Sequence, residues 1–271
     1  MDKKIAFIGA GSLAESIISG IIKAKVVSKE NIFVTNKSNI NRLEYIQAGY
    51  QVQCRTNKEE MTKQADIIIL AMKPKDAKLS LESIRGYVNK DQLIISVIAG
   101  LSTATIEDVI GIDIPVMRVM PNTSALIGQS ASALSCGRYV TEEHIQTTDL
   151  LFKTVGITKL VDEWDMHTVT AISGSGPAFI YYLVEAMEKA AVESGLDRAT
   201  ASDLITQTVI GAGEMLQQSG DTPAVLRKKI TSPGGTTEAG LADLDKNDFQ
   251  NIIQSCINHA RERSIVIGKS E

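Results

Sequence analysis

Short, continuously apolar runs alternate with helix-like segments along the first part of the chain. The apolar runs are rich in β-branched residues and cover residues 4–8, 31–35, 66–71, 93–97 and 115–119. The segments with helical character between them are residues 12–24, 39–48, 75–84 and 104–109. Runs without apolar–polar alternation are typical of parallel strands that are buried on both faces. The order of strands and helices therefore predicts an α/β fold with a doubly wound parallel sheet.

The periodicity changes after about residue 162, where the strand signals stop. Apolar residues then recur at helical spacing, first at Ile180, Leu183, Val184 and Met187. We therefore predict two domains, an α/β domain over residues 1–161 and an all-α domain over residues 162–271. The helices of the second domain carry many small apolar residues, which suit close packing against another subunit. We expect a homodimer, or a higher homo-oligomer built from dimers, through these C-terminal helices.

A glycine-rich segment joins the first predicted strand to the first predicted helix. It reads Gly9-Ala10-Gly11-Ser12-Leu13-Ala14, which is the GxGxxA pattern of a Rossmann-type dinucleotide site in the required strand–turn–helix context. The first glycine permits a tight turn, and the second lets a pyrophosphate approach the backbone. A glycine turn without a ligand is the alternative. The context favours a cofactor site that includes Gly9, Gly11, Ser12 and Leu13.

The end of the second predicted strand indicates which cofactor binds. NAD enzymes usually place an Asp or Glu there to hold the ribose 2′-hydroxyl. This chain has no acid at that place and offers Asn36, Lys37 and Ser38 instead. Neutral and cationic donors suit a 2′-phosphate, so we predict NADPH, with NADH possible as a second cofactor. The alternative is that Lys37 is a solvated residue at the start of a helix.

Two further loops follow predicted strands at the sheet edge where ligands of open α/β folds bind. The residues that we expect to contact the cofactor there are Ala71, Met72, Lys73, Pro74, Ala99 and Gly100. Lys73 is alternatively a salt-bridged surface lysine. Pro74 favours the first interpretation because it makes its loop rigid.

Composition narrows the classes of function. The chain has 271 residues and is 44% hydrophobic, which suffices for a core. Its net charge is −4 and its longest basic run is Arg227-Lys228-Lys229, which argues against nucleic acid as a partner. No apolar run has the length of a membrane span and no signal-peptide pattern precedes the first strand, so we expect a cytoplasmic protein without a membrane partner.

The cysteines and histidines are scattered without ligand spacing: Cys54, Cys136, Cys256, His144, His167 and His259. This pattern argues against a metal site and against a disulfide framework. We expect the cysteines to be buried thiols in a reducing compartment.

Two more loops carry hydroxyls, glycines and a proline where no apolar periodicity explains them. The segment from Thr231 to Thr237 reads TSPGGTT, and its N–H and hydroxyl donors at a helix start suit a small anion such as a carboxylate. The segment Ser173-Gly174-Ser175-Gly176-Pro177 also begins a predicted helix. Its simpler interpretation is a helix cap with proline in the first turn, which requires no ligand.

Taken with the other loops, these segments resemble the pyrroline-5-carboxylate reductase family. The matching pieces occur in the family's order over nearly the whole chain: FIGAGSLAESIISG, LAMKP, VIAG, RVMPNT, AISGSGPAF and TSPGGTTEAGL. TSPGGTT with the following Gly-Leu pair is highly specific, whereas GxGxxA alone is not. The resemblance implies a Rossmann domain with a helical dimerisation domain. It also implies reduction of L-Δ1-pyrroline-5-carboxylate to L-proline by NAD(P)H, the last step of proline biosynthesis.

The resemblance also implies roles for particular residues. Ser232, Thr236 and Thr237 would hold the substrate carboxylate, with the Thr237 hydroxyl near the ring nitrogen as the one catalytic contact. Asn122, with Thr123, would form part of the cofactor and substrate floor. The residues at the junction where the ring would stack are Ser173, Gly176 and Pro177. Departures from the family's usual residues are Ser12 and Leu13, where Asn-Met is common, and Ser124, where proline often follows.

Two other functions stay open from the sequence. A β-hydroxyacid dehydrogenase needs a lysine on the first helix after the second glycine loop, but the next lysine is Lys189, roughly 20 Å beyond Gly176 along a helix. A catalytically silent NADP-binding regulatory paralogue is the other alternative, although every predicted substrate loop is present. TSPGGTT and SGSGPAF contain no acid, so we expect positioning of an already electrophilic imine, with hydride transfer left to the cofactor.

Overall fold

The computed structural model of the chain describes residues 1–269. The chain forms two compact units, one of Met1–Ser175 with the segment from Asn258 onward, and one of Gly176–Ile257. This division falls later than the predicted boundary between residues 161 and 162. The reason is that residues 163–175 pack within the first unit, where the Glu163 carboxylate accepts hydrogen bonds from the N–H and hydroxyl of Thr103, at 2.8 and 2.7 Å.

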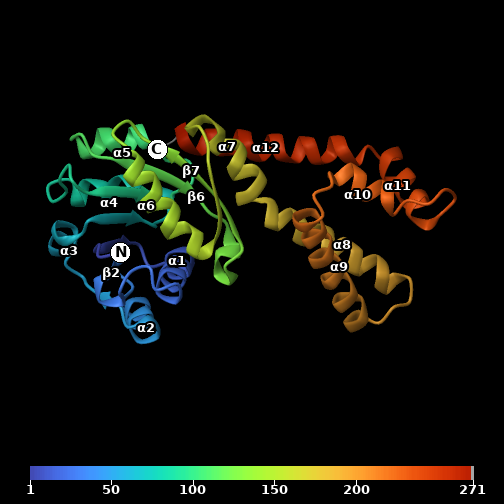
Figure 1. Ribbon diagram of the computed structural model, residues 1–271, viewed down its shortest axis with the longest axis horizontal. Helices are drawn as coiled ribbons and strands as arrows, with labels where there is room; N and C mark the ends of the chain where they lie inside the picture. Colours follow the sequence, from blue (N-terminus) through green and yellow to red (C-terminus); the bar gives the residue numbers. More distant parts are fainter. Residues whose placement is uncertain (270–271) are drawn as a thin grey trace. The chain divides into compact units, whose positions relative to one another are not determined.

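An eight-stranded sheet forms the centre of the first unit, with strand order β3-β2-β1-β4-β5-β6-β7-β8 (Figure 1). Neighbouring strands are parallel except β6 and β7, which are antiparallel. The strands are β1 Ile5–Ile8, β2 Ile32–Thr35, β3 Gln53–Cys54, β4 Ile67–Leu70, β5 Leu93–Ser96, β6 Val116–Met120, β7 Ser130–Cys136 and β8 Gly156–Leu160. The five predicted strands and the parallel sheet are confirmed, while β3, β7 and β8 were not predicted.

Helices cover both faces of this sheet, as the doubly wound prediction requires. Alternate residues of β1 enter opposite cores: Ile5 and Phe7 pack with helices α1, α2 and α6, and Ala6 and Ile8 pack with helices α3, α4 and α5. The α-helices that cover the sheet are α1 Ser12–Lys23, α2 Ile40–Tyr50, α3 Lys58–Gln64, α4 Ala77–Ile84, α5 Thr103–Ile110 and α6 Glu142–Phe152.

Short helical turns complete the first unit. The 3-10 turns are η1 Lys29–Asn31, η2 Pro74–Asp76, η3 Thr123–Ile127, η4 Lys153–Val155 and η5 Glu163–Asp165. A short helix α7, Met166–Val169, runs into a π-helical turn η6, Thr170–Gly174. Nδ1 of His167 lies 3.0 Å from the hydroxyl of Ser264, so the last turns of α12 belong to this unit.

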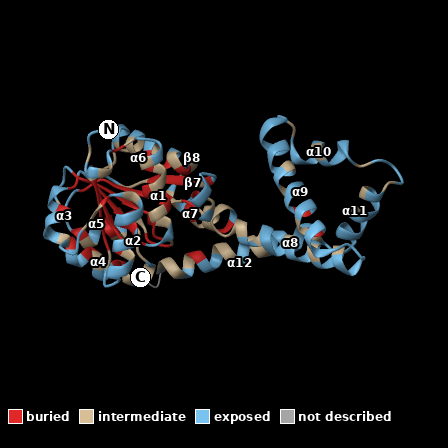
Figure 2. Cartoon of the chain, turned by 90° about the horizontal axis from the view of Figure 1, so that it is seen from below, coloured by how far each residue is buried: buried red, intermediate tan, exposed pale blue. Residues whose placement is uncertain are grey.

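The second unit is entirely helical, which confirms the predicted second half of the fold. Its helices are α8 Gly176–Glu193, α9 Arg198–Gln218, α10 Pro223–Lys229, α11 Thr236–Lys246 and the first part of α12 Phe249–Lys269. In Figure 2 these helices are almost wholly exposed or intermediate, and only Ala201 and Ile205 of this unit are buried.

The apolar stripe predicted on α8 is present but is not covered within the chain. Ile180, Leu183 and Met187 are 46%, 44% and 37% exposed. A helical face of this kind is stable when it is buried against another apolar surface. The exposed stripe therefore fits a protein that associates with further copies of itself.

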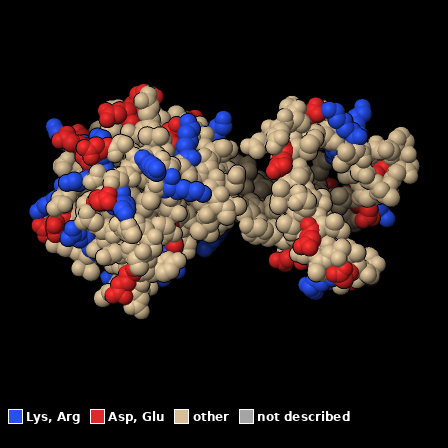
Figure 3. Space-filling view, turned by 60° about the horizontal axis from the view of Figure 1, so that its bottom comes forward, with Lys and Arg blue, Asp and Glu red and all other residues tan. Residues whose placement is uncertain are grey.

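The surface charge is mixed. On the face seen in Figure 3, basic and acidic side chains are interspersed over both units and form no broad basic area. Over residues 1–269, no helix combines the length and the apolar character that crossing a membrane requires.

Cys54, Cys136 and Cys256 are free thiols, but they are only partly buried, so the expectation of buried thiols is wrong. Cys54 and Cys136 pack against the edge of one core of the sheet, and Cys256 lies on α12 in the second unit. Burial still raises the pKa of the Cys54 thiol to about 11.

Candidate functional site

The carboxyl ends of β1 and β4 meet where the strand order reverses, which is where open α/β sheets bind ligands. Gly9 follows β1 at this point and has φ +117°. A Cβ atom at Gly9 would lie 2.3 Å from the carbonyl oxygen of Ala71, the residue that follows β4. Glycine is therefore required at position 9 by the backbone that faces it.

Gly11 occupies a different environment. It is the N-cap of α1, with φ −73° and no side-chain capping hydrogen bond. A Cβ atom there would meet no protein atom within 4 Å. The first-turn N–H groups of a helix have no partners within the helix and attract anions. The loop thus leaves open space over a set of N–H donors, which fits the predicted pyrophosphate.

Arg42 of α2 holds the glycine loop in place through two contacts. Its Nε donates to the carbonyl oxygen of Ala10 at 2.7 Å, and its guanidinium also pairs with Glu15 of α1. The Tyr50 hydroxyl donates to the same carboxylate at 2.9 Å. Burial alone raises the pKa of Glu15, but the hydrogen bonds from Arg42 and Tyr50 outweigh it and leave that pKa below its ordinary value. No sequence signal marked these contacts, because their members come from two helices.

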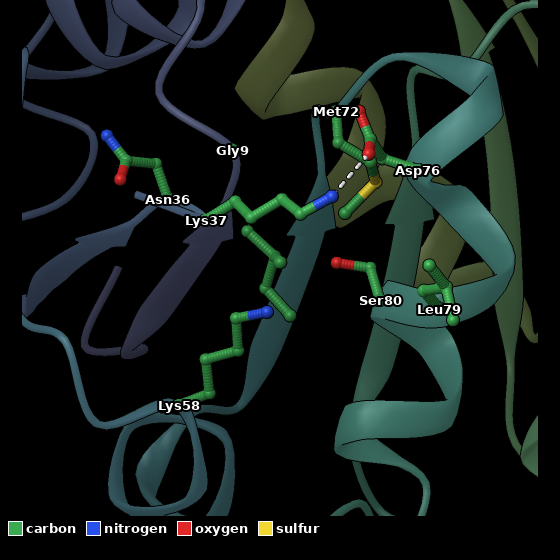
Figure 4. A pocket seen from close by; sticks show the side chains of 9 residues that line it. Gly9, Asn36, Lys37, Lys58, Met72, Asp76, Leu79 and Ser80 are labelled. Atoms are coloured by element: carbon green, nitrogen blue, oxygen red, sulfur yellow. Dashed lines mark hydrogen bonds and ion pairs between the residues drawn. The ribbon is translucent and has the colours of Figure 1, made fainter. Parts of the chain in front are cut away.

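A pocket of about 110 Å³ lies beside Gly9 (Figure 4). It is lined by Ile8, Gly9, Asn36, Lys37, Lys58, Met72, Asp76, Leu79 and Ser80. Four of these, Gly9, Asn36, Lys37 and Met72, are among the predicted cofactor residues. The pocket lies at the end of β2, where a Rossmann fold holds the adenosine ribose.

Three of the residues that line this pocket are charged: Lys37, Lys58 and Asp76. Lys37 Nζ lies 3.1 Å from Asp76 Oδ1, and this hydrogen bond holds the pKa of Asp76 below its usual value. The Lys37 side chain is 74% exposed although it is paired with Asp76. Its contact with the cofactor, against the alternative of a solvated residue at a helix start, stays a prediction. Lys58, at the start of α3, also directs its ammonium group into the pocket in Figure 4. Asp76, Lys58 and Ser80 were not predicted, since nothing in the sequence joins α3, α4 and β2 at one point.

Asn36 shapes the turn between β2 and α2. Its Nδ2 donates to the Asn39 carbonyl at 2.6 Å, and its Oδ1 accepts from the Asn39 N–H at 3.0 Å. Asn39 in turn caps α2 by accepting from the Arg42 N–H at 3.0 Å. Asn36 thus fixes the backbone that carries Lys37.

The other predicted cofactor residues lie outside this pocket: Gly11, Ser12, Leu13, Ser38, Ala71, Lys73, Pro74, Ala99, Gly100 and Asn122. Lys73 is exposed at the N-cap of η2, with Pro74 in the first position of that turn. Gly100 has a φ of +83°, and a Cβ there would lie 3.2 Å from the Gly268 nitrogen. Close packing on α12 therefore explains Gly100 without a ligand.

The loop after β6 contacts the π-helical turn. Nδ2 of Asn122 donates to the Ser173 carbonyl at 3.0 Å, and Oδ1 of Asn122 accepts from the Ser124 N–H at 3.1 Å. Proline, which often stands at position 124 in the family that the sequence resembles, has no N–H to donate. The Ser173 hydroxyl itself donates to the Val169 carbonyl at 3.1 Å. The structure thus brings together two of the predicted site loops, with Asn122 as their link.

In the second unit, the TSPGGTT loop turns into α11. Gly234 has φ +70° and its N–H donates to the Glu238 carboxylate at 2.7 Å, while the Gly235 N–H donates to the Ser232 carbonyl at 3.0 Å. These two N–H groups are thus engaged within the loop. Thr236 and Thr237 form the first turn of α11, whose N-cap has no side-chain hydrogen bond.

Hydroxyls add further donors to this loop, beside the first-turn N–H groups of α11. Ser232 and Thr236 are exposed and Thr237 is half-buried. Within residues 1–269, no hydrogen bond of the Ser232, Thr236 or Thr237 hydroxyl is formed to the protein. Gly176 and Pro177 form the first positions of α8 and are half-buried.

A glycine loop at the switch point of a 3-2-1-4-5-6 parallel core, with a helical unit after it, is typical of dinucleotide-binding oxidoreductases. Residues 163–266 match the family model described as pyrroline-5-carboxylate reductase dimerisation, and residues 4–100 match the one described as NADP oxidoreductase, coenzyme F420-dependent. Pyrroline-5-carboxylate reductase 2 of Bacillus subtilis is 49% identical over 98% of this chain and 95% of its own length. The Arabidopsis thaliana pyrroline-5-carboxylate reductase is 36% identical over 98% and 96%. The chain belongs to the pyrroline-5-carboxylate reductase family.

Solved structures agree with this assignment. The Plasmodium falciparum pyrroline carboxylate reductase with NADP bound has a TM-score of 0.88 at 32% identity, covering 98% of each chain. The Coxiella burnetii pyrroline-5-carboxylate reductase has a TM-score of 0.91 at 30% identity, covering 98% of this chain and 99% of its own.

Proposed function

We propose that this protein reduces the C=N bond of L-Δ1-pyrroline-5-carboxylate to give L-proline, with NADPH as the preferred reductant. The observation that carries the proposal is full-length membership of the reductase family with every loop of the predicted site present. The nicotinamide cofactor, when bound, supplies the hydride. The chain's own residues bind and orient the two reactants.

The glycine loop is suited to hold the dinucleotide. The N–H groups at the start of α1 face open space beside Gly11, and Arg42 fixes the loop through the Ala10 carbonyl. Ser12 and Leu13 begin the same helix. At the adenosine end, Lys37 and Ser38 supply the cationic and neutral donors that suit a 2′-phosphate, on a turn held by Asn36.

The hydroxyls of Ser232, Thr236 and Thr237 hold the substrate carboxylate in this proposal. The first-turn N–H groups of α11 add donors, because they have no partners within the helix. The Gly234 N–H is not available to the substrate, because it already donates to the Glu238 carboxylate. The neutral hydroxyls are therefore the main donors. Ser173, Gly176 and Pro177 form the surface against which the ring packs, and Asn122 holds the Ser173 backbone in place.

Thr237 is the proposed catalytic residue. Its hydroxyl lies at the ring nitrogen and donates to the lone pair that this nitrogen gains as hydride transfer converts the protonated imine into the amine. A protonated cyclic imine is electrophilic at the carbon of its C=N bond without further activation, so a strong acid is not needed. The contribution of the protein is then proximity and alignment of this imine carbon.

We further propose that two or more copies associate through the exposed apolar faces of α8 and its neighbours, and that the enzyme works in the cytoplasm. The helical dimerisation match and the exposed stripe support the first proposal. The free thiols support the second, because a reducing compartment keeps thiols unpaired.

The β-hydroxyacid dehydrogenase alternative is not favoured. The first lysine on α8 is Lys189, which pairs with Glu193 at 3.9 Å instead of marking an active site near Gly176. A silent paralogue is the remaining alternative.

The test follows absorbance at 340 nm in two reactions. Pyrroline-5-carboxylate is added with NADPH, where turnover lowers the absorbance, and 3-hydroxyisobutyrate is added with NADP⁺, where turnover raises it. Turnover with the imine alone supports the proposal. Binding of NADPH without turnover of either substrate would favour the silent paralogue.

A further inference from the structure

The adenosine pocket contains a carboxylate that its proposed ligand does not need. Asp76 lines the same pocket as Lys37 and Lys58, although a 2′-phosphate is itself negatively charged. Its carboxylate is partly buried, with 31% of the side chain exposed. A negative group at this place opposes the binding of a phosphate.

The orientation of Asp76 is not explained by helix capping. Asp76 is the N-cap of α4, a position where aspartate usually accepts a hydrogen bond from the second or third helical N–H. Here the side chain makes no capping bond and faces Lys37 Nζ at 3.1 Å instead. The Asp76 carboxylate therefore faces the pocket, where Figure 4 shows it opposite the Lys37 ammonium group.

A carboxylate in this pocket has a known use. Dinucleotide enzymes that take NADH hold the ribose 2′-hydroxyl with an acid, usually placed after the second strand. The segment after β2 contains Asn36 and Lys37 and no acid. Asp76 brings a carboxylate to the same pocket from the segment after β4, across the switch point.

Lys58 supplies the opposite charge. Within residues 1–269 it forms no ion pair with any carboxylate, and its ammonium group points into the pocket (Figure 4). Lys37 is shared with Asp76, so Lys58 is the lysine of the pocket whose charge is not already neutralised.

We propose that Asp76 is a specificity-determining residue of the cofactor site. It competes with a 2′-phosphate for Lys37, and it accepts a hydrogen bond from a ribose hydroxyl when that phosphate is absent. Asp76 thereby keeps the preference for NADPH over NADH small, and Lys58 provides a second positive charge that strengthens binding of the phosphate. This inference rests on the proposed binding of a nicotinamide dinucleotide at the pocket.

The test is direct binding of two fragments, 2′,5′-ADP and 5′-AMP, by isothermal titration calorimetry at a fixed salt concentration. They differ in the 2′-phosphate and do not depend on turnover. In Asp76→Asn, 2′,5′-ADP should bind about fivefold more tightly, the effect of removing one like charge near the surface. Binding of 5′-AMP should weaken by about threefold, because a neutral amide is a poorer acceptor than a carboxylate.

The Lys58→Met variant should change the ratio of the 2′,5′-ADP affinity to the 5′-AMP affinity in the opposite direction. Binding of 2′,5′-ADP should weaken about fivefold while binding of 5′-AMP stays as in the unaltered protein. Its affinity for 2′,5′-ADP should also fall less steeply with salt, since one charge contact is gone.

Glu59 and Lys63 provide matched controls. They form an ion pair at 2.7 Å on α3, and neither lines the pocket. Glu59→Gln and Lys63→Met should leave the affinities for both fragments unchanged. The melting temperatures of all four variants should equal that of the unaltered protein.

The outcomes separate the inference from the proposed function. Fragment ratios in Asp76→Asn and Lys58→Met that stay within twofold of the unaltered protein would overturn the inference, even if NADPH binds and turns over. Equal changes in the control variants would overturn it as well. If the unaltered protein binds neither fragment nor NADPH, the proposed function fails with it.

Discussion

Gly9 and Gly11 stand two residues apart, yet the structure predicts different failures when each becomes alanine. At Gly9, a Cβ would lie 2.3 Å from the Ala71 oxygen and 2.5 Å from its carbonyl carbon, and φ is +117°. The conformation alone costs about 1–3 kcal/mol for an L-residue. The contact adds to this cost, because backbone atoms of β4's end cannot rotate away as a side chain can. We expect Gly9→Ala to lower the free energy of unfolding by about 2–4 kcal/mol.

At Gly11, φ is −73° and a Cβ meets nothing within 4 Å, so Gly11→Ala should leave the fold unchanged. The methyl group instead occupies the space over the α1 N–H donors. We expect NADPH to bind at least about tenfold more weakly, since the pyrophosphate is displaced from its donors.

The assay pairs thermal unfolding without ligand with a fluorescence titration of NADPH. Gly9→Ala should lower the melting temperature by about 6–12 °C, at roughly 3 °C for each kcal/mol in a chain of this size. Gly11→Ala should melt as the unaltered protein does and lose affinity. Equal melting temperatures for all three proteins, or equal destabilisation by both substitutions, would refute the reasoning.

Three further predictions concern other parts of the proposed site. Thr237→Val should lower kcat/KM for the imine about fivefold or more, because a neutral hydrogen bond worth about 1 kcal/mol is lost. The NADPH affinity measured by titration should not change. An unchanged kcat/KM would show that Thr237 does not have this role. Asn122→Ala should lower the melting temperature and kcat together, because it frees the Ser173 carbonyl, whereas an effect on KM for NADPH alone would contradict this link. Arg42→Leu should reduce stability at neutral pH and less so in acid. The pKa of Glu15 is depressed in the fold, so its stabilising contribution is present above the unfolded value of 4.5 and is lost as the pH falls through the lower folded value. Denaturant unfolding of both proteins between pH 7 and pH 3 checks this, and a gap that widens toward acid would disprove it.

The sequence predicted the central strands because their signal is local. β4 is a run of three isoleucines and a leucine that is buried on both faces, and such a run has few alternatives. β7, Ser130–Cys136, consists of serine, alanine, leucine and cysteine without β-branched residues, and β3 has only two residues. Neither carries a strand signal of its own, because pairing with neighbouring strands determines them.

The residues of the candidate site also fall into two groups: those with a local sequence signal and those defined by contacts with distant segments. Gly9, Lys37 and Met72 could be predicted, since each lies within two residues of the end of a strand whose carboxyl end was expected at the ligand edge. Arg42, Lys58 and Asp76 could not, because each acts through a contact with a distant segment: the Ala10 carbonyl, the pocket, and Lys37. The predicted domain boundary shows a similar limit, as residues 163–175 are helical in sequence but pack on the first unit.

Conversion of a cyclic imino acid to proline at the expense of NADPH can be measured as product. The purified protein is incubated with NADPH and pyrroline-5-carboxylate, and L-proline is quantified by chromatography beside the loss of absorbance at 340 nm. We expect one L-proline for each NADPH oxidised, at a rate that falls in Thr237→Val. NADPH binding without proline formation, or oxidation that does not depend on the imine, would contradict this expectation.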